Sequence, residues 1–189
     1  GQKVDRAEWY APAFEANAYY DPQKNEIVVP AGILQFPFFQ EGFPAVLSYG
    51  GIGMIIGHEL THGFDNNGRL YGKDGHRTDW WDDRSASNFG QRVQCVVEQY
   101  SGYQVQEGLY INGKLTLAEN IADMGGVKFA YRAYKSRKRQ NESVELPVSG
   151  LTNDQLFFVA FAQAWCTLTT PQNERYQLSA DPHSPARFR

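Results

Sequence analysis

The sequence has few cysteines, no excess of positive charge and no long hydrophobic run. Its 18 lysines and arginines are outnumbered by 21 acidic residues, so nothing in the charge indicates nucleic-acid binding. The longest apolar run, 156–162, is too short to span a bilayer and is typical of a buried helix segment. No repeat, low-complexity stretch or signal peptide is visible. A hydrophobic content of 42% over 189 residues suffices for the core of one globular domain.

The two cysteines, Cys95 and Cys166, leave two alternatives open. They pair with each other, or both are free buried thiols. The basic run 132–139 lies at the end of a predicted helix, where cations favour the helix dipole, and we interpret it as solvated surface.

The most informative motif is an H-E-x-x-H box formed by His58, Glu59 and His62. On a helix the two histidines lie one turn apart on one face, where two neutral imidazoles can bind one zinc ion. Glu59 can then take a proton from a water molecule that the zinc activates. The apolar residues at 52 and 54–56 predict that this helix is buried. The alternatives are a chance match and a pair of ordinary core histidines, which would not need the intervening glutamate.

Two histidines leave a catalytic zinc one protein ligand short, and the best candidate is Glu119. Glu119 and Asp123 lie four residues apart on a predicted helix, where two like charges repel each other. The pair is explained if Glu119 binds zinc and Asp123 orients a ligand imidazole. The alternative is a solvated acidic face, but the neighbouring Ala122, Gly125 and Gly126 favour close packing.

Further motifs carry a resemblance that spans nearly the whole chain and keeps one order. They are NAYYDP at 17–22, EIVVPAGILQ at 26–35, GHELTHGFD at 57–65, DWW at 79–81, SASNF at 85–89, ENIAD at 119–123, HSP at 183–185 and FR at 188–189. With these motifs the chain resembles the catalytic domain of the neprilysin and endothelin-converting-enzyme family of zinc endopeptidases. The resemblance implies an α+β, mainly helical, thermolysin-like zincin domain with a small β-hairpin that supplies an edge strand.

The resemblance implies one zinc ion per chain, bound by His58, His62 and Glu119. It makes Glu59 the general base and proton shuttle, with Asp123 and Asp65 holding the ligand imidazoles in the right tautomer. His183, steadied by Asp181, would stabilise the oxyanion, and Arg189 would support that site and bind substrate carbonyls. Asn17 and Ala18 would bind the substrate main chain. The residues implied for an apolar pocket beyond the scissile bond are Ile33, Phe38, Met54, Ile55, Ala164 and Trp165.

The implied activity is cleavage of oligopeptides on the amino side of hydrophobic residues. Family members also have a large helical N-terminal domain over the active site and continue beyond position 189, so we expect residues 1–189 to be a fragment. The resemblance further implies an extracellular protein, either a membrane-anchored ectodomain or secreted. In its animal members the cysteines at positions 95 and 166 pair with partners outside this region. The sequon at Asn141 would suit a glycoprotein.

Local patterns predict the elements that carry these residues. We expect a hairpin within 16–30, and helices at 48–65, 85–100, 116–138 and 152–166, the last capped by Thr152. Asn112-Gly113 suggests the turn of a short hairpin, and 66–79 and 141–150 are predicted loops. The tail after 166 is predicted to be irregular while carrying His183 and Arg189.

Two other functions compete with this interpretation. One is a different zinc peptidase, such as a thermolysin-like or aminopeptidase relative, against which the NA and HSP motifs argue. The other is a catalytically silent binding or structural module that keeps the fold. The occupied catalytic positions make this second alternative the weaker one.

Overall fold

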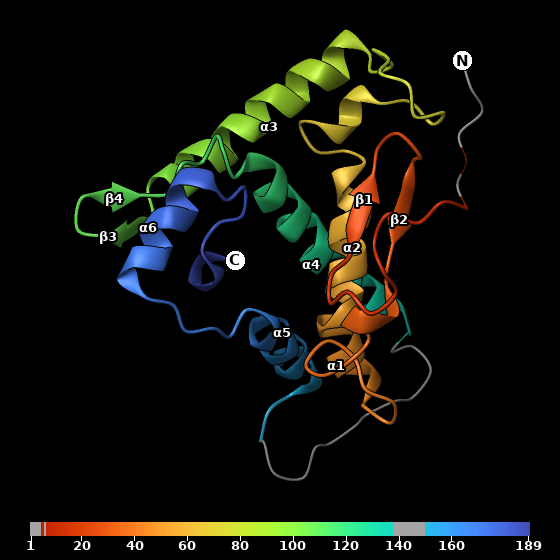
Figure 1. The fold of residues 1–189 in the computed structure, drawn as a ribbon, viewed down its shortest axis with the longest axis vertical. Helices are drawn as coiled ribbons and strands as arrows, with labels where there is room; N and C mark the ends of the chain where they lie inside the picture. Colours follow the sequence, from red (N-terminus) through yellow and green to blue (C-terminus); the bar gives the residue numbers. More distant parts are fainter. Residues whose placement is uncertain (1–4, 6, 138–149) are drawn as a thin grey trace.

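The computed structural model describes residues 5, 7–137 and 150–189, and these form a mainly helical structure with little strand, as predicted (Figure 1). Asn141 and the loop expected at 141–150, except for its last residue, lie outside the described residues. The helices are α1 (Ala45–Gly50), α2 (Ile52–His62), α3 (Asp83–Ser101), α4 (Leu117–Arg137), α5 (Asn153–Ala164) and α6 (Pro171–Ala180). The strands are β1 (Tyr19–Asp21), β2 (Glu26–Val28), β3 (Gln104–Gln106) and β4 (Leu109–Tyr110).

The predicted N-terminal hairpin is confirmed and lies beside α2 (Figure 1). Tyr19 pairs with Val28, and Asp21 pairs with Glu26. In the turn, the Asp21 carboxylate accepts hydrogen bonds from the amides of Gln23 and Lys24, at 2.8 and 3.2 Å. Among the described strands β1 pairs only with β2, so its other edge is unpaired.

The single helix predicted over 48–65 is wrong at both ends, because the structure has two helices that meet at Gly51. A side chain on Gly50 would clash with the backbone of Phe157 in α5, and one on Gly51 would clash with that of Phe38. The Ile52 amide donates to the Phe38 carbonyl at 2.8 Å, which fixes the bend. The second helix, α2, ends at His62, followed by Gly63.

The central contact of the fold is the close packing of α2 against α4. An added Cβ on Gly57 would lie 2.9 Å from the Gly126 carbonyl oxygen, and one on Gly126 would lie 2.7 Å from the Met54 oxygen. These distances allow only glycine, so the two backbones approach each other directly. The packing brings the histidines of α2 beside the carboxylates of α4.

The third helix, α3, confirms the helix predicted at 85–100 and begins at an Asp82 cap that accepts from the Ser85 amide. The hairpin turn expected at Asn112-Gly113 is wrong. The turn joins β3 to β4 at Gly108, which has φ of +71°. The Asn112 side chain instead accepts from the amides of Lys114 and Leu115, ahead of α4.

The C-terminal part contains one confirmed helix and one that was not expected. Thr152 and Gln155 form a capping box at the start of α5. The tail expected to be irregular contains α6, which Thr170 caps and Pro171 begins. Residues 181–189 then run between α4, α5 and α6, where the chain end lies in Figure 1.

The main core joins α1, α2, α4 and α5 to the N-terminal hairpin. Its buried residues are Ala18, Ile33, Val46, Ile52, Met54, Ile55, Ala130, Tyr134, Leu156 and Phe157. No helix within the described residues is both long and apolar enough to cross a membrane. Both cysteines are free and exposed, so they neither pair with each other nor form two buried thiols. Cys95 lies on an exposed part of α3, and Cys166 lies beyond the end of α5.

Candidate metal centre

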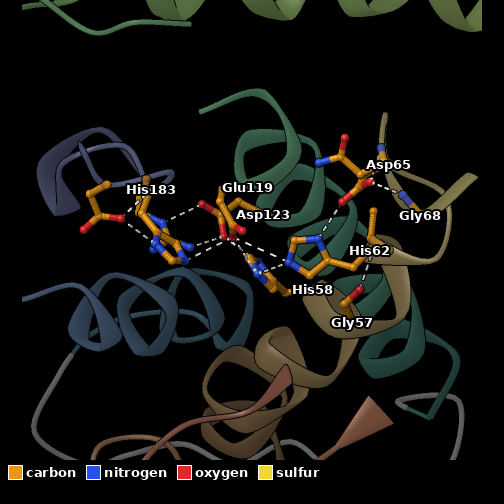
Figure 2. A network of polar contacts seen from close by, with 12 residues as sticks. Gly57, His58, His62, Asp65, Gly68, Glu119, Asp123 and His183 are labelled. Carbon is orange, nitrogen blue, oxygen red and sulfur yellow. Dashed lines mark hydrogen bonds and ion pairs between the residues drawn. The ribbon is translucent and has the colours of Figure 1, made fainter. Parts of the chain in front are cut away.

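Three segments distant in sequence supply one polar cluster. The first is α2 with His58 and His62, the second is α4 with Glu119 and Asp123, and the third is the tail with His183 (Figure 2). Glu59, also on α2, has a carboxylate near the two histidines. The i, i+4 spacing puts both α2 histidines on one face of the helix, as the sequence predicted. The glycine contact between α2 and α4 then brings Glu119 to this face.

The atoms of His58, His62 and Glu119 converge on one point. The Nε2 atoms of His58 and His62 lie 3.0 Å apart. The Glu119 Oε2 atom lies 3.2 Å from the first nitrogen and 3.5 Å from the second. This oxygen is buried and makes no hydrogen bond of good geometry.

This donor set fits a zinc ion. Each histidine places its Nδ1 against an aspartate, so Nδ1 carries the hydrogen and the neutral ring turns its Nε2 lone pair towards the shared point. Two lone pairs and a carboxylate oxygen that face one another need a cation between them. Ligands about 2.0–2.1 Å from a tetrahedral zinc lie about 3.3 Å apart, which falls between the observed 3.0 and 3.5 Å.

The two histidines are held from behind by different aspartates. His58 Nδ1 lies 2.8 Å from Asp123 Oδ1, and His62 Nδ1 lies 2.7 Å from Asp65 Oδ2. Asp65 is itself fixed, because its Oδ1 accepts from the amides of Asn67 and Gly68 at 2.7 Å each. Such partners set the tautomer and ring orientation of metal-binding histidines.

The electrostatics of the cluster favour positive charge. Burial lowers the pKa of His62, but the Asp65 and Glu119 carboxylates outweigh this effect and raise it to about 10. The pKa of His58 is raised as well, because Asp123 and Glu119 outweigh burial. Burial raises the pKa of Glu119, but the imidazoles of His183, His58 and His62 bring it well below its usual range. The same carboxylates would stabilise a bound dication.

Glu59 lies within reach of the shared point but differs in environment from Glu119. Its carboxylate and the two α2 histidines have ligand atoms within 4.8 Å of one another, which also makes these three a possible metal cluster. We favour Glu119 as the third ligand because its oxygen lies within 3.5 Å of both nitrogens. Burial raises the pKa of Glu59 above that of an ordinary glutamate, which suits a group that accepts a proton.

His183 comes to the cluster from the tail. Its Nε2 lies 3.2 Å from Glu119 Oε2, and its Nδ1 lies 2.8 Å from Asp181 Oδ1. The Asp181 carboxylate also accepts from the His183 amide at 2.9 Å. The contact with Glu119 raises the pKa of His183. The structure therefore brings the Asp181 carboxylate against the His183 ring.

Arg189 lies behind Asp123. Its Nε and Nη2 atoms donate to the two Asp123 oxygens at 2.7 and 2.9 Å, and neither bond uses Nη1. Burial raises the pKa of Asp123, but bonds from His58 and Arg189 outweigh burial and lower it. The guanidinium carbon lies 3.9 Å from the centre of the Trp165 ring, an arrangement that sequence reasoning missed.

The cluster opens into a cleft of about 560 Å³. The expected substrate-binding residues that line it are Asn17, Ala18, Ile33, Phe38, Ile55 and Trp165. The structure does not bring the other two to its wall. Met54 is fully buried in the core, and Ala164 lines a neighbouring hollow with Asp181 and His183.

A larger hollow of about 830 Å³ shares Tyr20 and Tyr71 with this cleft. It is lined by exposed apolar side chains of α2 and the following loop, including Leu60, Phe64 and Trp80. Its wall contains none of the residues that converge around Glu119. Size alone therefore does not locate the chemistry, and the smaller cleft is the candidate active site.

The sequence placed Asn67 and Gly68 only in the loop predicted at 66–79. Their amides bind Asp65 as well. An aspartate followed two and three residues later by Asn-Gly is the pattern of such a turn, so this signal was present in the sequence.

Comparison with known proteins finds relatives over nearly the whole chain. Residues 17–189 match the family model described as peptidase family M13. Human endothelin-converting enzyme 1 is 52% identical over 186 residues, which cover 98% of this chain and 24% of that protein. Neprilysin-1 of Caenorhabditis elegans is 50% identical over 188 residues, which cover 97% of this chain and 25% of that protein. The chain thus spans about a quarter of the length of these relatives.

Solved structures agree with this similarity. The Mycobacterium tuberculosis zinc metalloprotease Zmp1, in complex with an inhibitor, superposes with a TM-score of 0.91 at 41% identity. The match covers 98% of this chain and 29% of that one. Fold and sequence therefore point to the same family.

Proposed function

This chain belongs to peptidase family M13, and on that premise we propose that residues 1–189 form the zinc-binding catalytic domain of an endopeptidase, with a thermolysin-like zincin arrangement. The observation that carries the proposal is the convergence of His58 Nε2, His62 Nε2 and Glu119 Oε2 at 3.0–3.5 Å. These three atoms would hold one zinc ion per chain.

Bound zinc would supply Lewis acidity, which makes water a nucleophile at neutral pH and polarises a peptide carbonyl. Asp123 and Asp65 would keep the two imidazoles in the tautomer that leaves Nε2 free. Arg189 would hold Asp123 ionised and in place, and Trp165 would support the arginine from its ring face.

Glu59 would be the general base. Its carboxylate faces the same point without being needed as a ligand, and its raised pKa suits transfer of a proton in both directions. The residue would accept a proton from the attacking water and then deliver it to the leaving amine.

His183 would stabilise the negative charge that develops on the substrate carbonyl oxygen. Asp181 fixes its Nδ1, so the Nε2 side of the ring faces the cluster. A positioned donor of this kind commonly contributes about 10²–10³ in rate. Arg189 would also offer its Nη1 group to a substrate carbonyl, since this group is not used for Asp123.

The peptide would bind as an extended strand. Asn17 and Ala18 line the cleft just before β1, where they would bond to the substrate main chain. Ile33, Phe38, Ile55 and Trp165 would receive a hydrophobic side chain, which gives cleavage of oligopeptides on the amino side of hydrophobic residues.

We further propose that an N-terminal domain of the full-length protein covers this cleft and that the protein is extracellular, either membrane-anchored or secreted. Both proposals rest on the resemblance to neprilysin and endothelin-converting enzyme. Full-length relatives are about four times as long as this chain, which leaves room for such a domain.

Zinc analysis combined with cleavage of a quenched peptide series would test the function in the full-length protein. We expect one zinc per chain and chelator-sensitive cleavage before hydrophobic residues. One zinc without cleavage of any peptide would indicate a silent member of the family. Absence of zinc would refute the ligand set.

A further inference from the structure

A buried chain of hydrogen bonds lies directly behind the candidate active site. Ser184 Oγ donates to Asn120 Oδ1 at 2.7 Å, and Asn120 Nδ2 donates to Thr116 Oγ1 at 2.9 Å. Thr116 Oγ1 in turn donates to the Asn112 carbonyl at 3.2 Å. The three side chains are only 3%, 0% and 4% exposed, so water does not substitute for these partners.

This series of hydrogen bonds joins the tail to α4, the two segments that meet at the candidate metal centre. Ser184 follows His183 in the tail, and Asn120 follows Glu119 on α4. The bond between Ser184 and Asn120 therefore lies one residue from the 3.2 Å contact between His183 Nε2 and Glu119 Oε2. A shift of Ser184 relative to Asn120 would therefore shift His183 relative to Glu119.

His183 needs such an anchor because its ring lies at the surface and its shortest contact is with its own loop. The imidazole is 43% exposed, and its Nδ1 partner, Asp181, lies on the same short loop. A partner on the same loop orients the ring relative to the loop, but it does not fix the loop relative to α4. The link from Ser184 to Asn120 fixes the loop to α4 next to His183, whereas the bonds from Arg189 to Asp123 fix the end of the tail.

We propose that Ser184 and Asn120 are positioning residues, which hold His183 in register with Glu119 for the proposed peptidase reaction. The inference rests on the proposed function. Asn120 suits this role because one amide both accepts from Ser184 and donates to Thr116, so the buried series of hydrogen bonds has one direction. An apolar pair could fill the space but would not define a single register.

The first test is Ser184→Ala in the full-length protein, with Ser179→Ala as the matched control. Ser179 lies on the exposed side of α6, far in sequence from the metal ligands. We expect Ser184→Ala to keep its zinc and its KM but to lose about tenfold in kcat, since small misplacements of a reacting group are costly. The control should keep wild-type kcat. An unchanged kcat in Ser184→Ala would overturn the proposal.

A double-mutant cycle with His183→Gln separates positioning from general stability. If Ser184 acts through His183, Ser184→Ala should cost nothing further once His183 is gone. Equal losses in both backgrounds would overturn the proposal, because a merely structural role would be additive. If Ser184→Ala does not fold, Thr116→Val, at the far end of the hydrogen-bond series, replaces it in the same double-mutant cycle.

A second readout does not depend on turnover. In a crystal structure of Ser184→Ala, the distance between His183 Nε2 and Glu119 Oε2 should increase or the ring should occupy more than one position. An unchanged, singly occupied ring would overturn the positioning role. If the wild-type protein cleaves no peptide, the proposed function fails, while this geometric test still decides whether Ser184 fixes His183.

Discussion

His58 and His62 face each other through their Nε2 atoms at 3.0 Å, while their Nδ1 atoms are bound by two different aspartates. Two neutral imidazoles so oriented turn their lone pairs on each other, so either a proton or a metal ion must lie between the two nitrogens. Glu119 completes the arrangement with a buried oxygen that lacks a hydrogen bond of its own. The packing of α2 against α4 therefore brings His58 and His62 together with Glu119, and the proposed chemistry depends on this packing.

Glu59→Gln should retain zinc and lose nearly all turnover. The amide keeps the size of the side chain but accepts no proton, and general acid–base groups commonly contribute about 10²–10⁴ in rate. The measurement is kcat together with zinc content on the same preparation. A near-normal kcat would remove Glu59 from the mechanism.

Glu119→Ala should weaken zinc binding strongly, because only two protein ligands would remain. The matched control is Glu107→Ala, since Glu107 is an exposed glutamate beside the turn between β3 and β4. Competition with a chromophoric chelator would give both affinities. Equal affinities in the two variants would exclude Glu119 as a ligand.

Asp65→Asn and Asp123→Asn should each lower zinc affinity about 10–100-fold, because the tautomer of one ligand is no longer fixed. The loss should be greater for Asp123, which also binds Arg189 at 2.7 and 2.9 Å. Chelator competition measures both values. A larger loss for Asp65→Asn would contradict this ranking.

Zinc binding should release protons at pH 7.5. In the metal-free protein burial lowers the pKa of His62, but Asp65 and Glu119 raise it to about 10, so the ring is protonated at this pH. A ligand must give up that proton, and affinity should rise as the pH increases towards 10. Calorimetry in buffers of different ionisation enthalpy measures the release. Zinc uptake without proton release would show that the histidines are neutral beforehand.

Gly126→Ala should destabilise the protein and weaken zinc binding together. The new methyl group would lie 2.7 Å from the Met54 carbonyl oxygen and 2.9 Å from the backbone nitrogen of His58, so α4 must move away from α2. Overpacking of this kind costs about 1–3 kcal/mol. Chemical unfolding and chelator competition measure the two effects.

Gly90→Ala is the matched control for that variant. Gly90 lies in α3, and an added Cβ there would have nothing within 4 Å. Its substitution should stabilise the protein by about 0.5–1 kcal/mol, because alanine favours the helix. A stable Gly126→Ala variant with normal zinc affinity would contradict the proposed role of the helix contact.

Local signals predicted the elements that depend on neighbouring residues. The Asp21 turn, the Thr152 cap and the helical face of His58 and His62 all follow from short-range rules. The helix after Thr170 was not predicted, although threonine followed by proline is a good helix start signal. The spacing of Glu119 and Asp123 likewise suggested a ligand and its support.

Other features depend on contacts between distant segments. The bend at Gly51 exists because α1 packs on α5 and because Ile52 bonds to Phe38, which no local pattern contains. The burial of Met54 and the stacking of Arg189 on Trp165 depend in the same way on how the helices meet. The bond from Ser184 to Asn120 spans 64 positions, so only the fold could show it.

The most direct test of the proposed zinc site is a crystal structure of the full-length protein with anomalous data collected on both sides of the zinc absorption edge. We predict one zinc peak about 2.0–2.2 Å from His58 Nε2, His62 Nε2 and a Glu119 oxygen. A peak held by other residues, or no peak in protein that cleaves peptides, would contradict it.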